Sequence, residues 1–410
     1  MRAAQVKAFG GPEVLGTVDL PDPVAGPGEV LIEVAHADTI FVETQVRAGR
    51  FRAYFPVEPP YVPGGGVSGT VSEVGAGVDA GWVGRRVTSF VNGSYAERVT
   101  APVTALTPVP GELDLRTAAA LVHDGVTAAG LLERTAVAPG DRVLILGASG
   151  GMGTLLIQLA RARGARVLAA ARGAQKLALV RDLGAHAVVD VSDAGWVERA
   201  REALGNLGEP TASPTATEPA EPTEPAGRAE PTEPAERAEP AGFAERAEPA
   251  GRAGRAESAE PTGRAEPAEP AERAEPAGFA EPARRAGRAG RAESAESADV
   301  VLDGVGGELE LRAFPLVADG GRFSAHGAPS GGFAEVDGTE AGRRNVTLLG
   351  IGDVRFGEDE VRRLTAYVLE EAAAGRLRPM VGAEFPLTEA AAAHAAIEGR
   401  EVVGKVVLRA

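Results

Sequence analysis

The sequence VLILGASGGMG, at residues 143–153, decides how the chain folds. Its first four residues are apolar, which is typical of a buried strand, and the small residues that follow indicate a tight turn before a helix. Ala148, Gly150 and Gly153 have the spacing of the G-x-G-x-x-G/A dinucleotide fingerprint, with alanine in the first slot. Gly150 would let a pyrophosphate approach the backbone, and Gly153 would let the helix pack closely on the strand. The fingerprint alone is a weak signal, because a purely structural turn can have the same spacing.

Strands and helices alternate around this turn. Strands are expected at 142–146, 166–170, 187–190, 299–303, 322–324 and 345–349, and helices at 151–164, 176–183 and 196–204. This alternation predicts an α/β fold with a doubly wound parallel sheet. The strand before the turn and the helix after it favour dinucleotide binding over a purely structural turn.

The end of the second expected strand indicates which dinucleotide binds. An NAD site usually has an acid about 20 residues after the glycines, where it binds the ribose 2′-hydroxyl. Here the chain reads AAARGAQK at 169–176, without an acid. Arg172 and Lys176 could instead pair with a 2′-phosphate, so NADPH is the expected cofactor. The alternative is that both are solvated charges at the start of a helix.

Residues 209–298 differ in composition from the rest of the chain. They contain only Glu, Pro, Ala, Gly, Arg, Thr, Ser and two Phe, and EPAERAEPAGFAE occurs at both 233–245 and 269–281. The two copies are offset by 36 residues, and a repeat with this period could indicate a solenoid. However, one Phe per repeat offers no apolar face for stacking on a neighbouring repeat, and the prolines interrupt long helices. We therefore predict a disordered low-complexity insert. A semi-stiff spacer or docking arm is the alternative.

The composition argues against several functions. The chain has no cysteine, which excludes disulfides, thiolate catalysis and cysteine-based zinc sites. His36, His186, His326 and His394 lack metal-ligand spacing, so no metal is expected. The net charge of -16 argues against nucleic acid as a partner. The apolar runs are too short for a membrane span, and MRAAQVKAFGGPEVLG lacks the apolar core of a signal peptide, so we expect a cytoplasmic protein.

The segments that flank the turn resemble a known family. KAFGGPEVL, PGEVLIEV, PYVPGGGVSGTVSEVGAGV, VGRRVTSF and GSYAERVTAP, all within 1–105, resemble the GroES-like β-barrel of the medium-chain dehydrogenase/reductase superfamily, as does VVGKVVL at 402–408. GASGGMG at 147–153, LVHDGVTAAGLL at 121–132, ADVVLDGVGG at 298–307 and GGRFSAHGAPSG at 320–331 are similar to its zinc-less quinone oxidoreductases, the relatives of zeta-crystallin. The resemblance covers the whole chain except the insert.

The resemblance implies a domain organisation. A GroES-like substrate domain would span 1–115 and be completed by 351–410, and a Rossmann NADPH-binding domain would comprise 116–208 and 299–350. The insert at 209–298 would enter before the fourth Rossmann strand. The last Rossmann strand, at 345–349, would lie at the sheet edge, where family members often pair it with a second copy. A homodimer is therefore expected.

The resemblance also implies zinc-independent hydride transfer from NADPH to a quinone or to an activated alkene or carbonyl. The family's cofactor positions fall on Thr127 beside the nicotinamide; Ser149, Gly150, Gly151, Met152 and Gly153 on the pyrophosphate; Arg172 and Lys176 on the adenosine phosphate; Gly304 and Val305 near the nicotinamide ribose; and Gly327 after the fifth strand.

The expected substrate pocket departs from the family pattern. Ile40 stands where the family often has Asn, Phe51 where it often has Tyr, and Gly66 where it often has an acid. Tyr54 is one candidate proton donor, or else an aromatic residue on a loop. His123 is the other candidate, or else a polar residue associated with a helix. Quinone reduction needs neither, because water can protonate a hydroquinone.

Two other functions stay open. An enoyl-thioester or alkenal double-bond reductase on the same fold would need a proton donor, for which Tyr54 is a candidate. An NADPH-binding sensor or scaffold with little turnover would instead use the insert to recruit a partner.

Overall fold

The computed structural model of the protein describes residues 1–52, 55–207, 296–330, 332 and 336–410. The predicted insert lies outside the described residues except for 296–298, and Tyr54 lies outside them as well. Ala298, which we expected to end the insert, already belongs to a strand.

The described strands and helices follow in chain order. The strands are β1 (Arg2–Val6), β2 (Leu15–Asp19), β3 (Glu29–Asp38), β4 (Gly66–Val74), β5 (Arg86–Phe90), β6 (Arg98–Pro102), β7 (Leu106–Pro108), β8 (Arg142–Leu146), β9 (Arg166–Ala171), β10 (Ala187–Asp190), β11 (Ala298–Asp303), β12 (Val317–Ala325), β13 (Thr347–Leu349), β14 (Val381–Pro386) and β15 (Lys405–Arg409). The α-helices are α1 (Phe41–Arg47), α2 (Leu115–Arg134), α3 (Gly151–Ala162), α4 (Ala174–Asp182), α5 (Trp196–Asn206), α6 (Gly307–Ala313), α7 (Gly338–Arg343), α8 (Glu358–Ala373) and α9 (Ala390–Glu398). Short 3₁₀ helices are η1 (Pro12–Val14), η2 (Ala80–Trp82), η3 (Val103–Ala105), η4 (Phe314–Leu316), η5 (Ile351–Val354) and η6 (Leu387–Glu389).

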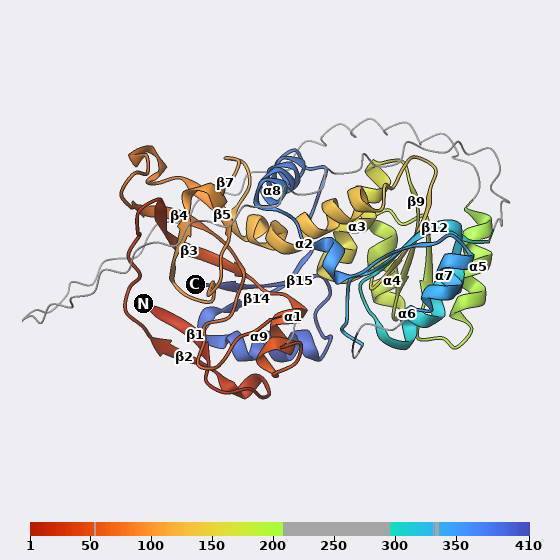
Figure 1. Ribbon diagram of the computed structural model, residues 1–410, viewed down its shortest axis with the longest axis horizontal. Helices are drawn as coiled ribbons and strands as arrows, with labels where there is room; N and C mark the ends of the chain where they lie inside the picture. The colour runs from red at the N-terminus through yellow and green to blue at the C-terminus, as the bar shows by residue number, and fades with distance from the viewer. Residues whose placement is uncertain (53–54, 208–295, 331, 333–335) are drawn as a thin grey trace, which may run out of the picture. The chain divides into compact units, whose positions relative to one another are not determined.

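One sheet is parallel throughout and has the strand order β10-β9-β8-β11-β12-β13. Figure 1 shows helices on both of its faces, which confirms the predicted doubly wound fold. The strand order changes direction between β8 and β11, and ligands of such sheets bind beyond the carboxyl ends of the strands at this switch point. β13 lies at one edge, as predicted. It begins at Thr347, two residues later than expected, because Asn345 adopts a φ of 52° in the turn after α7.

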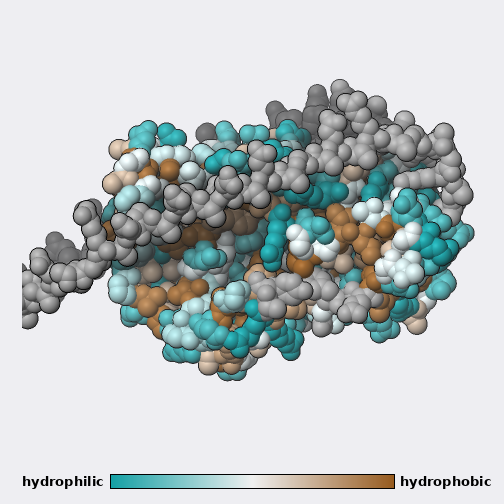
Figure 2. All heavy atoms as spheres, viewed as in Figure 1, coloured by the Kyte–Doolittle hydropathy of each residue, from teal (hydrophilic) through white to brown (hydrophobic). Residues whose placement is uncertain are grey.

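The core of the parallel sheet explains its sequence pattern. Val143 and Ile145 of β8 pack into a cluster with residues of α2, α3 and α8, whereas Leu144 and Leu146 pack on the other face with residues of α5 and η4. A parallel strand covered on both faces needs an apolar residue at every position, which is why 143–146 reads VLIL. α5 buries a single stripe, and Figure 2 shows hydrophilic side chains on its outer side.

The second large sheet, called the mixed sheet below, has the order β14-β15-β3-β4-β5-β7, with β6 also paired to β3. β15 is antiparallel to β3 and parallel to β14, so the C-terminal segment joins a sheet that the N-terminal segment begins. α2 follows β7 of this sheet and leads to β8 of the parallel sheet. Among the described helices, none is long and apolar enough to cross a membrane.

Candidate active site

The predicted dinucleotide turn joins β8 to α3. Gly147 adopts a φ of 69°, a left-handed conformation that glycine takes at little cost. A Cβ on Gly153 would lie 2.4 Å from the carbonyl oxygen of Gly147, so the strand and the helix meet there without room for a side chain. Gly150 is exposed at the start of α3. The turn therefore has the close packing and the open backbone that the fingerprint predicts.

A cluster of cations lies beyond the carboxyl end of β9. Arg172 follows this strand, and Lys176 lies in the first turns of α4, where its ammonium donates to the carbonyl oxygen of Arg400 at 3.4 Å. Arg172 and Arg400 line one surface pocket together with Arg312 and Glu308. Burial, and then the charge of Arg172, lower the pKa of Arg400.

Arg400 was not expected from the sequence, because its contact with Lys176 joins positions 224 residues apart. Its place in the connection after α9, which ends at Glu398, gives no signal of a binding role.

The turns after β11 and β12 bring three expected cofactor residues together. Asp303 accepts hydrogen bonds from the backbone N–H groups of Val305 and Gly306, both at 2.9 Å, which folds the chain sharply after β11. The N–H of Gly327 donates to the carbonyl oxygen of Asp303 at 3.2 Å. A Cβ on Gly327 would lie 2.2 Å from the carbonyl oxygen of Gly304. Gly304, Val305 and Gly327 therefore form one surface at the carboxyl edge of the parallel sheet.

His326 lies at the same place, although the sequence analysis treated it as one of several scattered histidines. Its Nδ1 contacts Ser324 Oγ at 3.2 Å, and its Nε2 is buried without a hydrogen-bonding partner among the described residues. A Cβ on Gly304 would lie 3.5 Å from this Nε2. Burial lowers the pKa of His326 to about 4, so the ring is neutral at neutral pH.

One face of α2 is open in an otherwise buried stretch. Every residue of this helix from Ala118 to Leu132 is buried except His123, Asp124 and Thr127. The spacing i, i+1, i+4 places these three side chains on the same side of the helix. A Cβ on Gly151 would lie 2.2 Å from Asp124 Oδ2, so this face adjoins the dinucleotide turn. The structure thus brings the predicted residues His123 and Thr127 to the edge of the turn.

The other side of this open face adjoins the mixed sheet. A Cβ on Gly65 would lie 3.0 Å from Nε2 of His123, and a Cβ on Gly66 would lie 3.1 Å from Nδ1. A side chain at either glycine would therefore press against the imidazole. The departure at Gly66, where the family often has an acid, makes room for His123.

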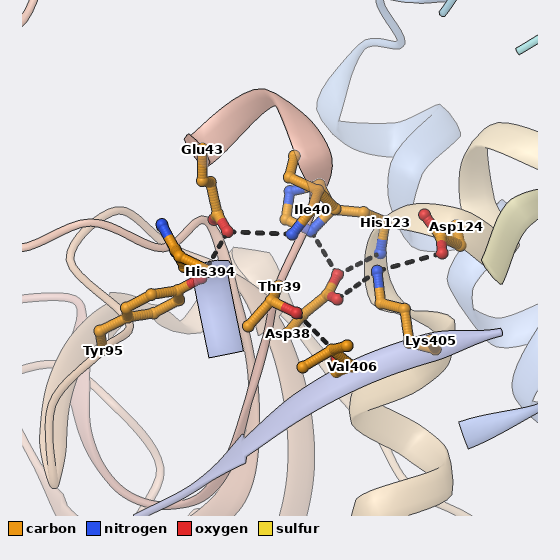
Figure 3. Close-up of polar contacts among 10 residues, drawn as sticks. All are labelled: Asp38, Thr39, Ile40, Glu43, Tyr95, His123, Asp124, His394, Lys405 and Val406. Atoms are coloured by element: carbon orange, nitrogen blue, oxygen red, sulfur yellow. Dashed lines mark hydrogen bonds and ion pairs between the residues drawn. The ribbon is translucent and has the colours of Figure 1, made fainter. Parts of the chain in front are cut away.

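A buried charge cluster lies directly behind His123 (Figure 3). Asp38, at the end of β3, is fully buried and accepts from His123 Nδ1 at 2.6 Å. The ammonium of Lys405 lies 2.5 Å from the other oxygen of Asp38 and 3.1 Å from Asp124 Oδ2. Asp38 and Lys405 were not among the residues expected from the sequence, although each is a charged residue at one end of a strand.

A second buried polar group adjoins this cluster in Figure 3. The hydroxyl of Tyr95 donates to Glu43 at 2.7 Å and lies 3.1 Å from His394 Nε2, and the N–H of Ile40 donates to Glu43 at 3.0 Å. Burial raises the pKa of Glu43 to about 7. Glu43 therefore holds the start of α1, and with it Ile40, against the mixed sheet.

No cluster of three or more His, Asp or Glu side chains that could bind a metal occurs among the described residues. Three family models match the chain. The alcohol dehydrogenase GroES-like domain matches residues 26–111, and two models described as zinc-binding dehydrogenase match 151–210 and 280–408.

Several characterised proteins are similar to this chain. A quinone oxidoreductase of Rattus norvegicus is 38% identical over 212 residues, which cover 51% of this chain and 64% of the relative. A 2-haloacrylate reductase of a Burkholderia species is 35% identical over 211 residues, which cover 50% of this chain and 63% of the relative. The matches therefore span less than two thirds of these relatives.

Solved structures match over their full length. A mycobacterial protein in complex with NADPH is 28% identical, with a TM-score of 0.73 and complete coverage of both chains. The quinone oxidoreductase of Escherichia coli in complex with NADPH is 20% identical, also with a TM-score of 0.73 and complete coverage of both chains, and shows the same fold.

Proposed function

Because the chain belongs to the medium-chain dehydrogenase/reductase superfamily, we propose that it is an NADPH-dependent oxidoreductase that reduces a quinone or an activated alkene or carbonyl. Relatives named quinone oxidoreductase and 2-haloacrylate reductase support these two substrate classes. The observation that carries the proposal is the open face of α2, where His123 and Thr127 lie between the dinucleotide turn and the mixed sheet.

The residues of the turn fit a dinucleotide. Gly150 has no side chain to block a pyrophosphate, and the first N–H groups of α3 have no partner within the helix. Ser149, Gly151, Met152 and Gly153 complete this phosphate-binding segment.

The cation cluster supports the choice between NADPH and NADH. Arg172, Lys176 and Arg400 would bind the 2′-phosphate, which is the only group that distinguishes the two cofactors. Charge-assisted hydrogen bonds to phosphate are stronger than neutral ones, so three cations give a marked preference for NADPH.

The surface formed by Gly304, Val305 and Gly327 would hold the nicotinamide end. Bound NADPH would supply the hydride there. A buried nitrogen without a hydrogen bond is costly in a folded protein, so the free Nε2 of His326 supports a ligand at this position. Thr127 would contact the same end of the cofactor from α2.

The proposed reaction uses no zinc. The sequence has no cysteine, and the described residues offer no set of three ligands. Activity should therefore survive dialysis against a strong chelator.

Stopped-flow measurement of NADPH oxidation, with a panel of quinones and enones as acceptors, tests the proposed function. We expect turnover of at least one of the two classes and tighter binding of NADPH than of NADH. Tight binding of NADPH without turnover of any acceptor would indicate a sensor or scaffold instead.

A further inference from the structure

The two nitrogens of His123 have different surroundings. Nδ1 is 2.6 Å from the buried carboxylate of Asp38, whose other oxygen is 2.5 Å from Lys405 Nζ. Among the described residues, Nδ1 is the only nitrogen of this ring with a hydrogen-bonding partner, and the side chain is 20% exposed. The ring is therefore fixed from behind, while Nε2 remains available to a ligand in front of the open face of α2.

The charges around the ring favour its protonated form. Burial lowers the pKa of His123, but the hydrogen bond and charge of Asp38, together with the charge of Glu43, outweigh burial and the opposing charge of Lys405 and raise this pKa above its ordinary value. Burial raises the pKa of Asp38, but Lys405 and His123 offset this and hold it below its usual range. Asp124, the remaining charged neighbour, contacts Lys405 at 3.1 Å.

We propose that His123 donates a proton from Nε2 to the reduced substrate, that Asp38 is the residue that positions it, and that the preferred acceptor is an α,β-unsaturated carbonyl compound. This inference rests on the proposed function, because it assigns the substrate class of that same site.

The reaction adds one hydride and one proton across a carbon–carbon double bond. The hydride forms a new C–H bond at the β-carbon, and the π-electron pair of the double bond moves to the α-carbon and the carbonyl oxygen as an enolate. The N–H bond of His123 then breaks, its proton forms the C–H bond at the α-carbon, and the ring becomes neutral. Solvent returns the proton, since the ring is partly exposed.

The same residue has little to offer a quinone. A hydroquinone anion carries its charge on oxygen, and water protonates oxygen rapidly without a positioned donor. An enolate that must be protonated on carbon gains far more from a fixed acid, and general acid catalysis typically contributes about 10²–10⁴-fold. The ion pair of Asp38 and Lys405 behind the imidazole of His123 therefore favours a reaction in which carbon is protonated.

A purely structural role is the competing explanation. His123 could simply join α2 to β3, because its N–H and Nδ1 both contact Asp38. The test must therefore include measurements that distinguish the loss of a proton donor from a loss of structure.

The experiment compares the wild type with His123→Gln, Asp38→Asn and the control His186→Gln. His186 is exposed and lies outside the site, directly before β10. For each protein we would measure NADPH affinity by fluorescence, and kcat with 2-methylcyclohex-2-enone and with 1,4-benzoquinone. The enantiomeric excess of the 2-methylcyclohexanone product reports protonation at the α-carbon, and NMR titration reports the protonation of His123.

We expect His123→Gln to lower kcat with the enone by about 100-fold or more, to change kcat with the quinone less than about fivefold, and to reduce the enantiomeric excess. NADPH affinity should stay within about threefold. In the wild type, the enone rate should fall as the pH rises through the pKa of His123, and Asp38→Asn should move both this decline and the NMR midpoint to lower pH. The control should match the wild type.

Three outcomes would overturn the inference. One is an equal loss of enone and quinone turnover in His123→Gln, which indicates a structural role. Another is an unchanged enantiomeric excess in that variant. The third is a wild type that reduces quinones but no enone, which leaves the proposed function intact. A wild type that reduces neither class would instead refute the proposed function itself.

Discussion

The backbone N–H of Gly404 donates to the carbonyl oxygen of Ser149 at 3.0 Å, which joins the start of β15 to the dinucleotide turn. The next residue, Lys405, pairs with Asp38 behind His123. A short stretch of the C-terminal segment therefore contacts both the expected phosphate-binding backbone and the carboxylate that holds the proposed proton donor.

Cofactor preference should depend on the cation cluster. The double variant Arg172→Ala/Lys176→Ala should lose most of the preference for NADPH, because each charge-assisted contact with phosphate contributes about 1.5–3 kcal/mol. Arg400→Ala should weaken NADPH binding by about tenfold or more. The affinity for NADH, which has no 2′-phosphate, is the internal control in the titrations. Equal affinities of the wild type for both nucleotides would contradict the assignment.

Gly153→Ala should disrupt the dinucleotide turn. The new Cβ would lie 2.4 Å from the carbonyl oxygen of Gly147, so α3 would have to move away from β8. We expect at least tenfold weaker NADPH binding and a loss of about 1–3 kcal/mol in the free energy of unfolding. The control is Gly342→Ala in α7, where a Cβ would meet nothing within 4 Å and the helix should be unchanged or stabilised. Similar behaviour of the two variants would refute the packing argument.

The pH dependence of stability should reveal the buried carboxyl of Glu43. Its pKa is raised by burial from 4.5 to about 7, so ionisation is easier in the unfolded chain than in the folded one. Stability should therefore fall as the pH rises from about 4.5 to 7, by roughly 3 kcal/mol or less. Burial also raises the pKa of Asp303 to about 7, so part of the decline should remain in Glu43→Gln. In urea denaturation series, Glu43→Gln should therefore make the decline shallower, whereas Glu73→Gln on the surface should not. Parallel profiles for Glu43→Gln and the wild type would show that Glu43 ionises normally.

Self-association should depend on the edge strand β13. Leu348 is 39% exposed on this strand, and an unpaired apolar edge favours pairing with a second copy. We expect light scattering to show a homodimer of the wild type and a monomer of Leu348→Lys. Leu311→Lys, at an exposed leucine of α6, should remain dimeric. A monomeric wild type at micromolar concentration would rule out this assembly.

Replacing residues 209–295 by a few Gly and Ser residues should leave NADPH affinity and turnover within about threefold. Both flanks are anchored, since Leu204 and Leu207 on one side and Ala298 on the other are buried. Shortening the loop should raise stability by about 2 kcal/mol or less, because closure entropy grows only with the logarithm of length. Loss of activity in a folded deletion variant would place the segment in the substrate site.

Strands β8, β9 and β11 of the parallel sheet could be predicted well because nearly every position along them is buried. VLIL at 143–146 has no other stable environment, and β8 and β10 have the bounds that were expected. Asp38 and Lys405 could not be paired from the sequence, since their contact exists only after β3 and β15 become neighbours in the mixed sheet. The available signal was weak, because the same two strands also carry Glu29, Glu33 and Arg409. Arg400 gave no comparable signal, because it lies on a polar connection.

The expected site residues of the parallel sheet all follow carboxyl ends of strands, at β8, β9, β11 and β12. The chain between α5 and β11, however, enters β11 at its amino end, on the opposite edge of the sheet. The two described ends of this junction therefore lie at the edge of the sheet opposite the expected binding residues. We therefore expect the junction to be a permissive position for protein engineering, where a reporter or affinity module could replace the natural segment without loss of NADPH affinity.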